Sequence, residues 1–261
     1  MPGGISIGEK EIFQEMINEF EATFVQELVP GILHNFANPL NGIMGRSKLL
    51  QRKVEKSFEN INYEKNIDDE ILEERKKIVH DIDLIINESD RLFNLFNDVT
   101  GKLQRLRDTA VRKINLYELI ETEMAFFNFY LDFKHNIHKE LKLDRQIPEV
   151  TGSTADYSVA LSALIRHAAN SMKDSQLKKL IISTYCDATH VCVKIENTGM
   201  NADVDQEKEL PKNRDAVDGS FLERNENKEL FNAFSLLKKY DALFQLEGGV
   251  EFNAISVRIP Y

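Results

Sequence analysis

The chain has 261 residues, of which 42% are hydrophobic and 29% charged, and its formal net charge is −10. This length suits one large or two ordinary domains, and the composition is that of a folded protein rather than a disordered chain. An acidic chain repels phosphate backbones, which argues against a nucleic acid as partner. Cys186 and Cys192 make neither a disulfide framework nor a metal knuckle, and we expect no metal site.

The N-terminal residues combine no basic region with an apolar run, so they do not resemble a secretory signal peptide. No stretch approaches the roughly 18 uncharged apolar residues that a membrane-spanning helix needs. We therefore expect a cytoplasmic protein that does not enter a membrane.

The first part of the chain predicts one long helix from Glu11 to Lys56. Its apolar residues recur at steps of three and four, beginning with Phe13. Pro30 and Pro39 lie inside this stretch. Each removes a backbone hydrogen bond, so we expect the helix to bend at both.

A second helix is predicted from Asp69 to Arg107, after a polar turn around residues 60–69. Its apolar residues follow a heptad seam with one polar interruption, at Ser89. The seam consists of Ile71, Ile78, Ile82, Ile85, Leu92, Phe96, Val99, Leu103 and Leu106. One hairpin cannot bury a seam of this length, whereas two hairpins can bury it in a four-helix bundle. We therefore predict a homodimer.

The texture changes near Arg112, where shorter helices alternate with strands. The predicted elements are a strand and helix over Ile114–Phe129, a strand over Ile137–Leu143, a helix over Thr154–Lys173 capped by Ser153 or Thr154, strands over Leu180–Cys186 and His190–Glu196, a loop over Asn201–Glu229, a helix over Leu230–Tyr240 and a hairpin of Leu243–Leu246 with Val250–Ile259. The fold class is α+β, with a helical hairpin over 1–110 and an α/β sandwich over 111–261.

The most informative segment is His34-Asn35-Phe36-Ala37-Asn38-Pro39-Leu40-Asn41-Gly42-Ile43-Met44-Gly45. It resembles the phosphoacceptor box of two-component sensor histidine kinases, in which a helical His is followed five residues later by Pro and then by Leu-Asn. The resemblance implies that His34 carries a phosphoryl group and that the partner is a response-regulator receiver domain. Chemically, one ring nitrogen can be phosphorylated if an acceptor holds the other as N–H.

Two asparagines beside His34 are candidate catalytic residues. The family usually has an acidic general base directly after the His, and this chain has Asn35. An amide can orient an N–H group but cannot take up a proton at neutral pH. Transfer from an aspartyl phosphate should tolerate this change better than attack on ATP. Asn38 matches a family position that aligns water for dephosphorylation, although it could equally be a plain exposed amide.

A receiver that reaches His34 must contact the same helical face. Steps of three and four from His34 lead to Asn38 and then to a docking set of Asn41, Gly42, Gly45, Arg46 and Leu49. Each glycine costs about 1 kcal/mol inside a helix. The two glycines therefore suggest a close approach, either by the second helix or by a docking partner.

The second half of the chain resembles the ATP-binding domain of the same family in a degenerate form. His167 stands where the Mg²⁺-coordinating Asn belongs, and imidazole is a poor ligand for Mg²⁺. Asn170 lies one turn further on. It could serve in a shifted register, or it could be a cap or surface residue.

The segment Asn197-Thr198-Gly199 resembles the strand end whose Asp receives the adenine amino group, with Asn197 in the place of the Asp. The glycine-rich phosphate lid has no counterpart. Between residues 201 and 229 the chain has one glycine, Gly219, and nine acidic against five basic residues. Backbone N–H groups can wrap a polyphosphate only where side chains leave room, so we predict weak or absent ATP binding.

These observations favour a phosphorelay protein that exchanges a phosphoryl group between His34 and receiver aspartates. Two alternatives remain open: an autophosphorylating histidine kinase with a divergent nucleotide site, and a non-catalytic helical adaptor. No cofactor is expected for the first, and Mg·ATP is implied only by the kinase alternative. The type of enzyme, phosphotransferase or kinase, is thus left open by the sequence.

Overall fold

The computed structural model describes residues 7–23, 28–61, 68–199, 228–248 and 252–261. By their contacts, the residues form two compact units. One unit comprises residues 27–100, and the other comprises 1–26 together with 101–261. Each unit is described by itself.

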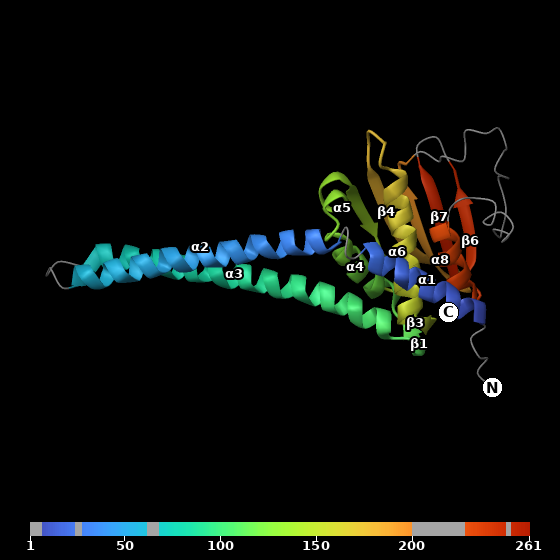
Figure 1. Ribbon diagram of the computed structural model, residues 1–261, viewed down its shortest axis with the longest axis horizontal. Helices are drawn as coiled ribbons and strands as arrows, with labels where there is room; N and C mark the ends of the chain where they lie inside the picture. The colour runs from blue at the N-terminus through green and yellow to red at the C-terminus, as the bar shows by residue number, and fades with distance from the viewer. Residues whose placement is uncertain (1–6, 24–27, 62–67, 200–227, 249–251) are drawn as a thin grey trace. The chain divides into compact units, whose positions relative to one another are not determined.

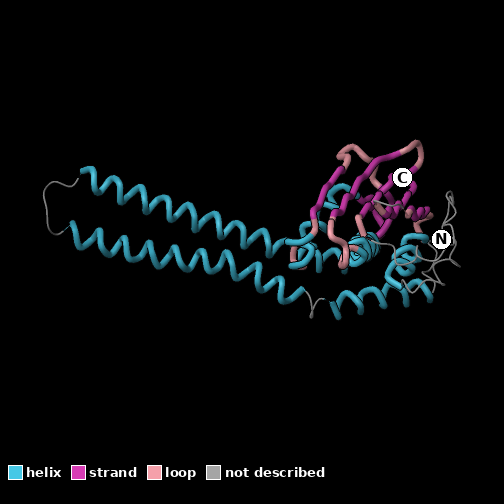
Figure 2. The backbone as a smooth tube through the Cα atoms, turned by 90° about the horizontal axis from the view of Figure 1, so that it is seen from above, coloured by secondary structure: helices cyan, strands magenta, loops and turns pink. Residues whose placement is uncertain are grey.

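The first unit is a helical hairpin of α2 (Val29–Ile61) and α3 (Asp68–Arg107), which lie side by side along their length (Figures 1 and 2). Two contacts give the antiparallel register. Gly42 of α2 faces Glu88 of α3, and Lys53, further along α2, donates to Asp81, which comes earlier in α3. The last turns of α3, from residue 101, belong to the other unit.

The predicted single helix over Glu11–Lys56 is described in two parts, and whether it is continuous falls on residues outside the description. The two parts are α1 (Ile7–Thr23) and α2, and residues 24–27 lie between them in the sequence. Pro30 lies at the start of α2, close to those residues. Pro39 lies inside α2, as predicted.

The apolar seam predicted on α3 divides into two stripes. Ile78, Ile85, Leu92 and Val99 are half-buried, whereas Ile82, Phe96 and Leu103 are exposed in the single chain. A second exposed row lies next to them: Val79, Ile86 and Phe93. The inner stripe therefore serves the chain itself, and the outer one leaves large apolar side chains in water. The dimeric four-helix bundle that would cover them remains a prediction.

The second unit has a five-stranded sheet in the order β2-β4-β5-β7-β6. Its strands are β2 (His138–Lys142), β4 (Lys179–Cys186), β5 (His190–Asn197), β6 (Leu243–Glu247) and β7 (Asn253–Pro260). Only β2 and β4 pair in parallel; the other pairs are antiparallel. A small separate sheet pairs β1 (Val111–Ile114) with β3 (Val150–Ser153). The predicted α+β class is confirmed.

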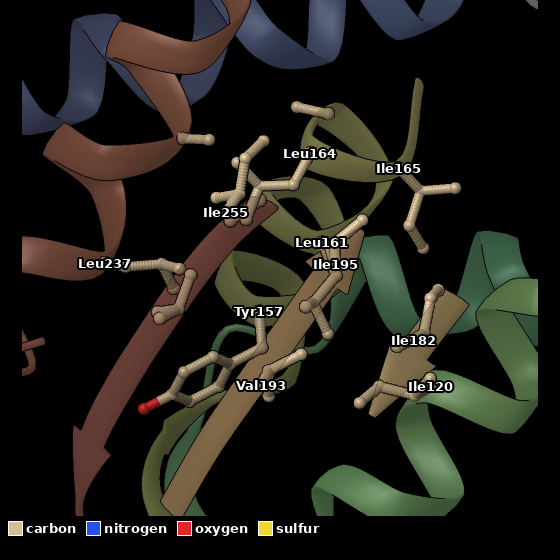
Figure 3. Close-up of a cluster of buried hydrophobic side chains, with 14 of the residues drawn as sticks. Ile120, Tyr157, Leu161, Leu164, Ile165, Ile182, Val193, Ile195, Leu237 and Ile255 are labelled. Atoms are coloured by element: carbon tan, nitrogen blue, oxygen red, sulfur yellow. The ribbon is translucent and has the colours of Figure 1, made fainter. Parts of the chain in front are cut away.

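Helices cover one face of this sheet: α4 (Leu116–Phe127), α6 (Thr154–Ser171) and α8 (Lys228–Lys238). Figure 3 shows their side chains meeting the strands, with Leu161, Leu164 and Leu237 directed toward Val193 and Ile255. The helix α1 packs on α6 and α8 and places Met16 in the same core.

Local signals place several of these elements correctly. Ser153 caps α6 as predicted, by accepting a hydrogen bond from the Asp156 backbone N–H at 3.4 Å. The short helix α5 (Leu131–Asn136) and the strand β3 were not predicted. The predicted loop over Asn201–Glu229 falls almost entirely outside the described residues.

Candidate functional site

His34 lies in the second turn of α2 with its side chain exposed. Within the described part of the chain, its ring has no hydrogen-bond partner. Asn35, the next residue, is buried with only 4% of its surface exposed. Successive helical residues point about 100° apart, so Asn35 and His34 face different surroundings. The Asn35 side chain is therefore directed to the interior of the unit, while the His34 side chain is open to a partner.

The exposed face of α2 continues from His34 through Asn38, Asn41 and Gly45. These residues follow at steps of four, three and four, so they lie above one another on the helix. Leu49, one turn further, is also exposed, at 50%. Much of the predicted docking set thus lies on one open surface. Gly42 and Arg46 are only half-exposed.

The two glycines of the box have different surroundings. A Cβ atom at Gly42 would lie 3.3 Å from Cγ of Glu88 on α3, which is a tight contact. A Cβ atom at Gly45 would meet nothing within 4 Å. The second helix therefore accounts for Gly42. Nothing described in this chain accounts for Gly45, which leaves that part of the face open to a partner.

The ion pair at the middle of the hairpin joins Lys53 Nζ to Asp81 Oδ2 at 2.5 Å. The hydrogen bond from Lys53 holds the pKa of Asp81 below its ordinary value, and the nearby Arg46 adds to the effect. The Arg46 side chain therefore already interacts electrostatically with α3. It is not a free docking residue, and an acidic residue in its place would repel Asp81.

The residues that resemble an adenine site are closed by the chain itself. The side-chain oxygen of Asn197 accepts from Ser171 Oγ at 2.9 Å and from the Gly199 backbone N–H at 2.8 Å. Asn197 is 2% exposed. A Cβ atom at Gly199 would lie 2.3 Å from Ser171 Oγ, so Gly199 is needed for this close approach. The amide of Asn253 then donates to the Gly199 carbonyl at 2.5 Å.

The other two nucleotide-site candidates lie on α6. Asn170 is exposed and His167 is half-buried on α6. At the start of α8, the carboxylate of Glu229 lies 3.2 Å from Nε of Arg166. The positive N-terminal end of a helix attracts a phosphate. In α8 the Glu229 carboxylate already occupies this end. The acidic segment predicted to replace the phosphate lid lies outside the described residues.

A buried charged cluster escaped the sequence analysis. The ammonium group of Lys102, which is 0% exposed, donates to Glu123 Oε2 at 2.6 Å, to Ser158 Oγ at 2.8 Å and to Ser162 Oγ at 2.6 Å. Arg105 donates to the other oxygen of Glu123 at 3.3 Å. Burial alone would raise the pKa of Glu123. The two cations and these hydrogen bonds have the larger, opposite effect, so the pKa of Glu123 lies below its ordinary value.

This cluster anchors the end of α3 to α4 and α6, because Lys102 belongs to the first element and its partners to the other two. The rings of Phe20 and Phe126 lie 5.6 and 5.7 Å from the ammonium nitrogen. A small cavity beside it is lined mostly by apolar side chains. All three donors of Lys102 have acceptors, so the cluster stabilises the fold.

Sequence reasoning missed Ser171, Asn253 and the Lys102 cluster for the same reason. Asn253 meets Gly199 because β5 and β7 are neighbours in the sheet, and strand order is not written in local periodicity. Lys102 has the spacing of an ordinary exposed lysine.

None of the described helices is long and apolar enough to cross a membrane.

In structure, the chain is similar to sensor histidine kinases. The histidine kinase AdeS of Acinetobacter baumannii is 15% identical, with 82% of this chain and 94% of that chain covered and a TM-score of 0.43. The nucleotide-free catalytic domain of the histidine kinase ThkA is 17% identical, with 58% and 95% covered and a TM-score of 0.45.

A bacterial phosphotransferase is 11% identical, with 98% of this chain and 99% of that chain covered and a TM-score of 0.39. No known family profile matches the chain, and no curated protein matches it by sequence. At these identities the similarity concerns the fold alone, and function is argued from the residues of this chain.

Proposed function

We propose that the chain is a phosphotransfer protein of two-component signalling, which carries a phosphoryl group on His34 and exchanges it with receiver-domain aspartates. The observation that carries this proposal is the exposed face of α2. It starts at an unencumbered imidazole and runs through Asn38 and Asn41 to the open Gly45. The His-to-Pro-Leu-Asn box supplies the chemistry, and the exposed face supplies access for a partner.

The reaction needs little from the chain beyond position. An unprotonated ring nitrogen of His34 attacks the phosphorus of an aspartyl phosphate. A P–N bond forms, the P–O bond breaks, and the aspartate leaves as a carboxylate. The return step reverses these events on a second receiver. Because an acyl phosphate is already activated, no strong base is required, which agrees with Asn35 in the place of an acidic residue.

Asn38 is the polar side chain closest to His34 along this exposed face. It is free to contact a bound receiver or a water beside it, and we assign it to the control of hydrolysis. Asn35 and Asn38 then have different roles. The Asn35 amide is buried in the interior, and the Asn38 amide lies on the exposed face where the reaction takes place. We place the protein in the cytoplasm, with the receivers that it serves.

The kinase alternative requires ATP in the second unit. The closed contacts of Asn197 with Ser171 and Gly199 and the Glu229 carboxylate at the start of α8 speak against it. Titration calorimetry with Mg·ATP should show no binding tighter than about millimolar, or roughly −4 kcal/mol. A micromolar dissociation constant, with labelling of His34 by ATP, would favour the kinase.

The direct test is a labelling experiment with the full chain. Receiver domains from the same organism are phosphorylated on their aspartates with labelled acetyl phosphate and then mixed with wild-type or His34→Gln protein. Wild type should take up label from at least one receiver, and His34→Gln should take up none. Equal labelling of both proteins, or of neither, would refute the proposal. A functional His34→Gln protein in cells would favour the adaptor alternative instead.

A further inference from the structure

The exposed face that starts at His34 continues beyond the docking residues as a basic stripe. After Gly45 it reaches Lys48, Arg52 and Lys56 at steps of three, four and four, and all three side chains are exposed. At 100° per residue, they lie within about 40° of His34 around the helix axis. The three cations and the phosphoacceptor therefore share one side of α2.

No described side chain pairs with these cations. None of the three forms an ion pair or hydrogen bond with a described residue, whereas Lys53 between them pairs with Asp81. Between residues 46 and 56 there are five basic residues and one acidic residue, in a chain whose net charge is −10. A concentration of positive charge in an acidic protein is the pattern expected where an acidic partner binds.

The length of the face fits a small globular domain. At 1.5 Å per residue, Lys48 lies roughly 21 Å from His34 along the axis and Lys56 roughly 33 Å. A small domain is about 30 Å across. A domain whose reacting carboxyl group sits at His34 can therefore rest on Gly45 and still reach the cations with its far edge.

We propose that Lys48, Arg52 and Lys56 form a docking surface for an acidic protein surface. Resting on the proposed function, we assign that acidic surface to the receiver domain that exchanges the phosphoryl group with His34. Exposed charges in water attract over a distance of about 10 Å and add little to a close contact. The stripe therefore speeds the encounter and selects acidic receivers, while the transfer itself depends on His34.

The kinetic test uses a triple variant, Lys48→Glu with Arg52→Glu and Lys56→Glu. Its matched control is Lys113→Glu with Lys173→Glu and Lys238→Glu, which changes the net charge equally at exposed positions of the other unit. At low salt, kcat/KM for His34 labelling by a phosphorylated receiver should fall tenfold or more in the stripe variant. The control should stay within about twofold of wild type, and kcat at saturating receiver should be unchanged in both.

A binding assay separates this inference from the proposed function. A fluorescent decaglutamate peptide should bind wild type and His34→Gln equally at low salt, and the stripe variant more weakly than the control. If no receiver labels His34 but the peptide still selects the stripe, the phosphotransfer proposal fails and the acid-binding surface stands. Equal salt dependence in the stripe and control variants would overturn the inference. So would loss of the dimer in the stripe variant alone, because the stripe would then contact a second copy.

Discussion

Gly42 and Gly45 lie three residues apart on α2, yet they meet different environments. Gly42 packs against Glu88, and Gly45 meets open space. A glycine that packs against a neighbour has a structural reason to be small. A helical glycine that meets no described neighbour lowers stability without a packing gain among the described residues, which agrees with the proposed docking of a partner there.

Gly45→Ala should therefore stabilise the hairpin by about 0.5–1 kcal/mol, since alanine has the higher helix propensity and no clash opposes it. Gly42→Ala should gain less or lose stability, because its Cβ atom would press on Glu88. Chemical denaturation of both variants measures the difference. Equal effects would contradict the assigned contacts.

The same position offers a test of docking without loss of the fold. Gly45→Gln adds bulk on the exposed face and should keep the melting temperature while transfer to His34 slows at least tenfold, provided that the receiver docks there. Arg46→Glu is the poorer test, because its effect on Asp81 would weaken the hairpin as well. A normal transfer rate in Gly45→Gln would show that the partner approaches by another face.

Lys102 forms a fully buried ion pair with Glu123 in the second unit. Lys102→Met leaves the Glu123 carboxylate buried beside only one cation, and should cost about 3–5 kcal/mol. The double variant Lys102→Met with Glu123→Leu should recover part of the loss, since no buried carboxylate remains. Denaturant unfolding compares the two. If the double variant is no more stable than the single one, the ion pair is not the cause.

At the scale of elements, the apolar periodicity predicts the helical hairpin, but it does not predict which apolar side chains of α3 are buried. The sequence indicates helices in α2 and α3, but the division of the α3 seam depends on which side chains pack against α2. Ile85 and Phe96 look alike in a heptad pattern, yet the first is half-buried and the second is 54% exposed. Only the register set by Gly42 and Lys53 separates them.

The ion pair between Lys53 and Asp81 makes the hairpin sensitive to acid. The pKa of Asp81 in the folded chain lies below its ordinary value of 3.8, chiefly through the Lys53 hydrogen bond. Its stabilisation is therefore fully present above pH 3.8 and is lost as the pH falls through the lower, folded pKa. The difference in melting temperature between wild type and Asp81→Asn should shrink in that range. Asp83→Asn, at an exposed neighbour, should show no such trend.

The exposed stripe of α3 should hold two chains together. Ile82→Asp with Phe96→Asp should convert a dimer of roughly 60 kDa, twice the chain mass, into a folded monomer, because both side chains are exposed in the single chain. Asn87→Asp with Asn94→Asp adds the same charge on a flanking exposed face and should leave the dimer intact. Sedimentation of the three proteins decides. If the wild-type protein is a monomer, the predicted dimeric four-helix bundle is wrong.

For the whole molecule, the fold class could be read from the sequence, and the closed contacts around Asn197 could be read only in part. Asn197, at the position where the resemblance implies an Asp, and the shortage of glycines predict weak ATP binding. The contacts that close it, Ser171 and Asn253 around Gly199, depend on the approach of α6 to the sheet and on strand order. Likewise, the sequence predicts a boundary at residue 110, while the contacts divide the chain at residue 100 and group α1 with the second unit.

The measurement that tests the central claim most directly is phosphorus NMR of the full chain mixed with one equivalent of a phosphorylated receiver. The acyl phosphate signal should decay while a phosphohistidine signal appears, and that signal should be absent in His34→Gln. Adding a second, unphosphorylated receiver should then discharge the phosphohistidine. If the acyl phosphate decays only to inorganic phosphate in wild type, whichever cognate receiver is supplied, His34 does not carry the phosphoryl group and the account is wrong.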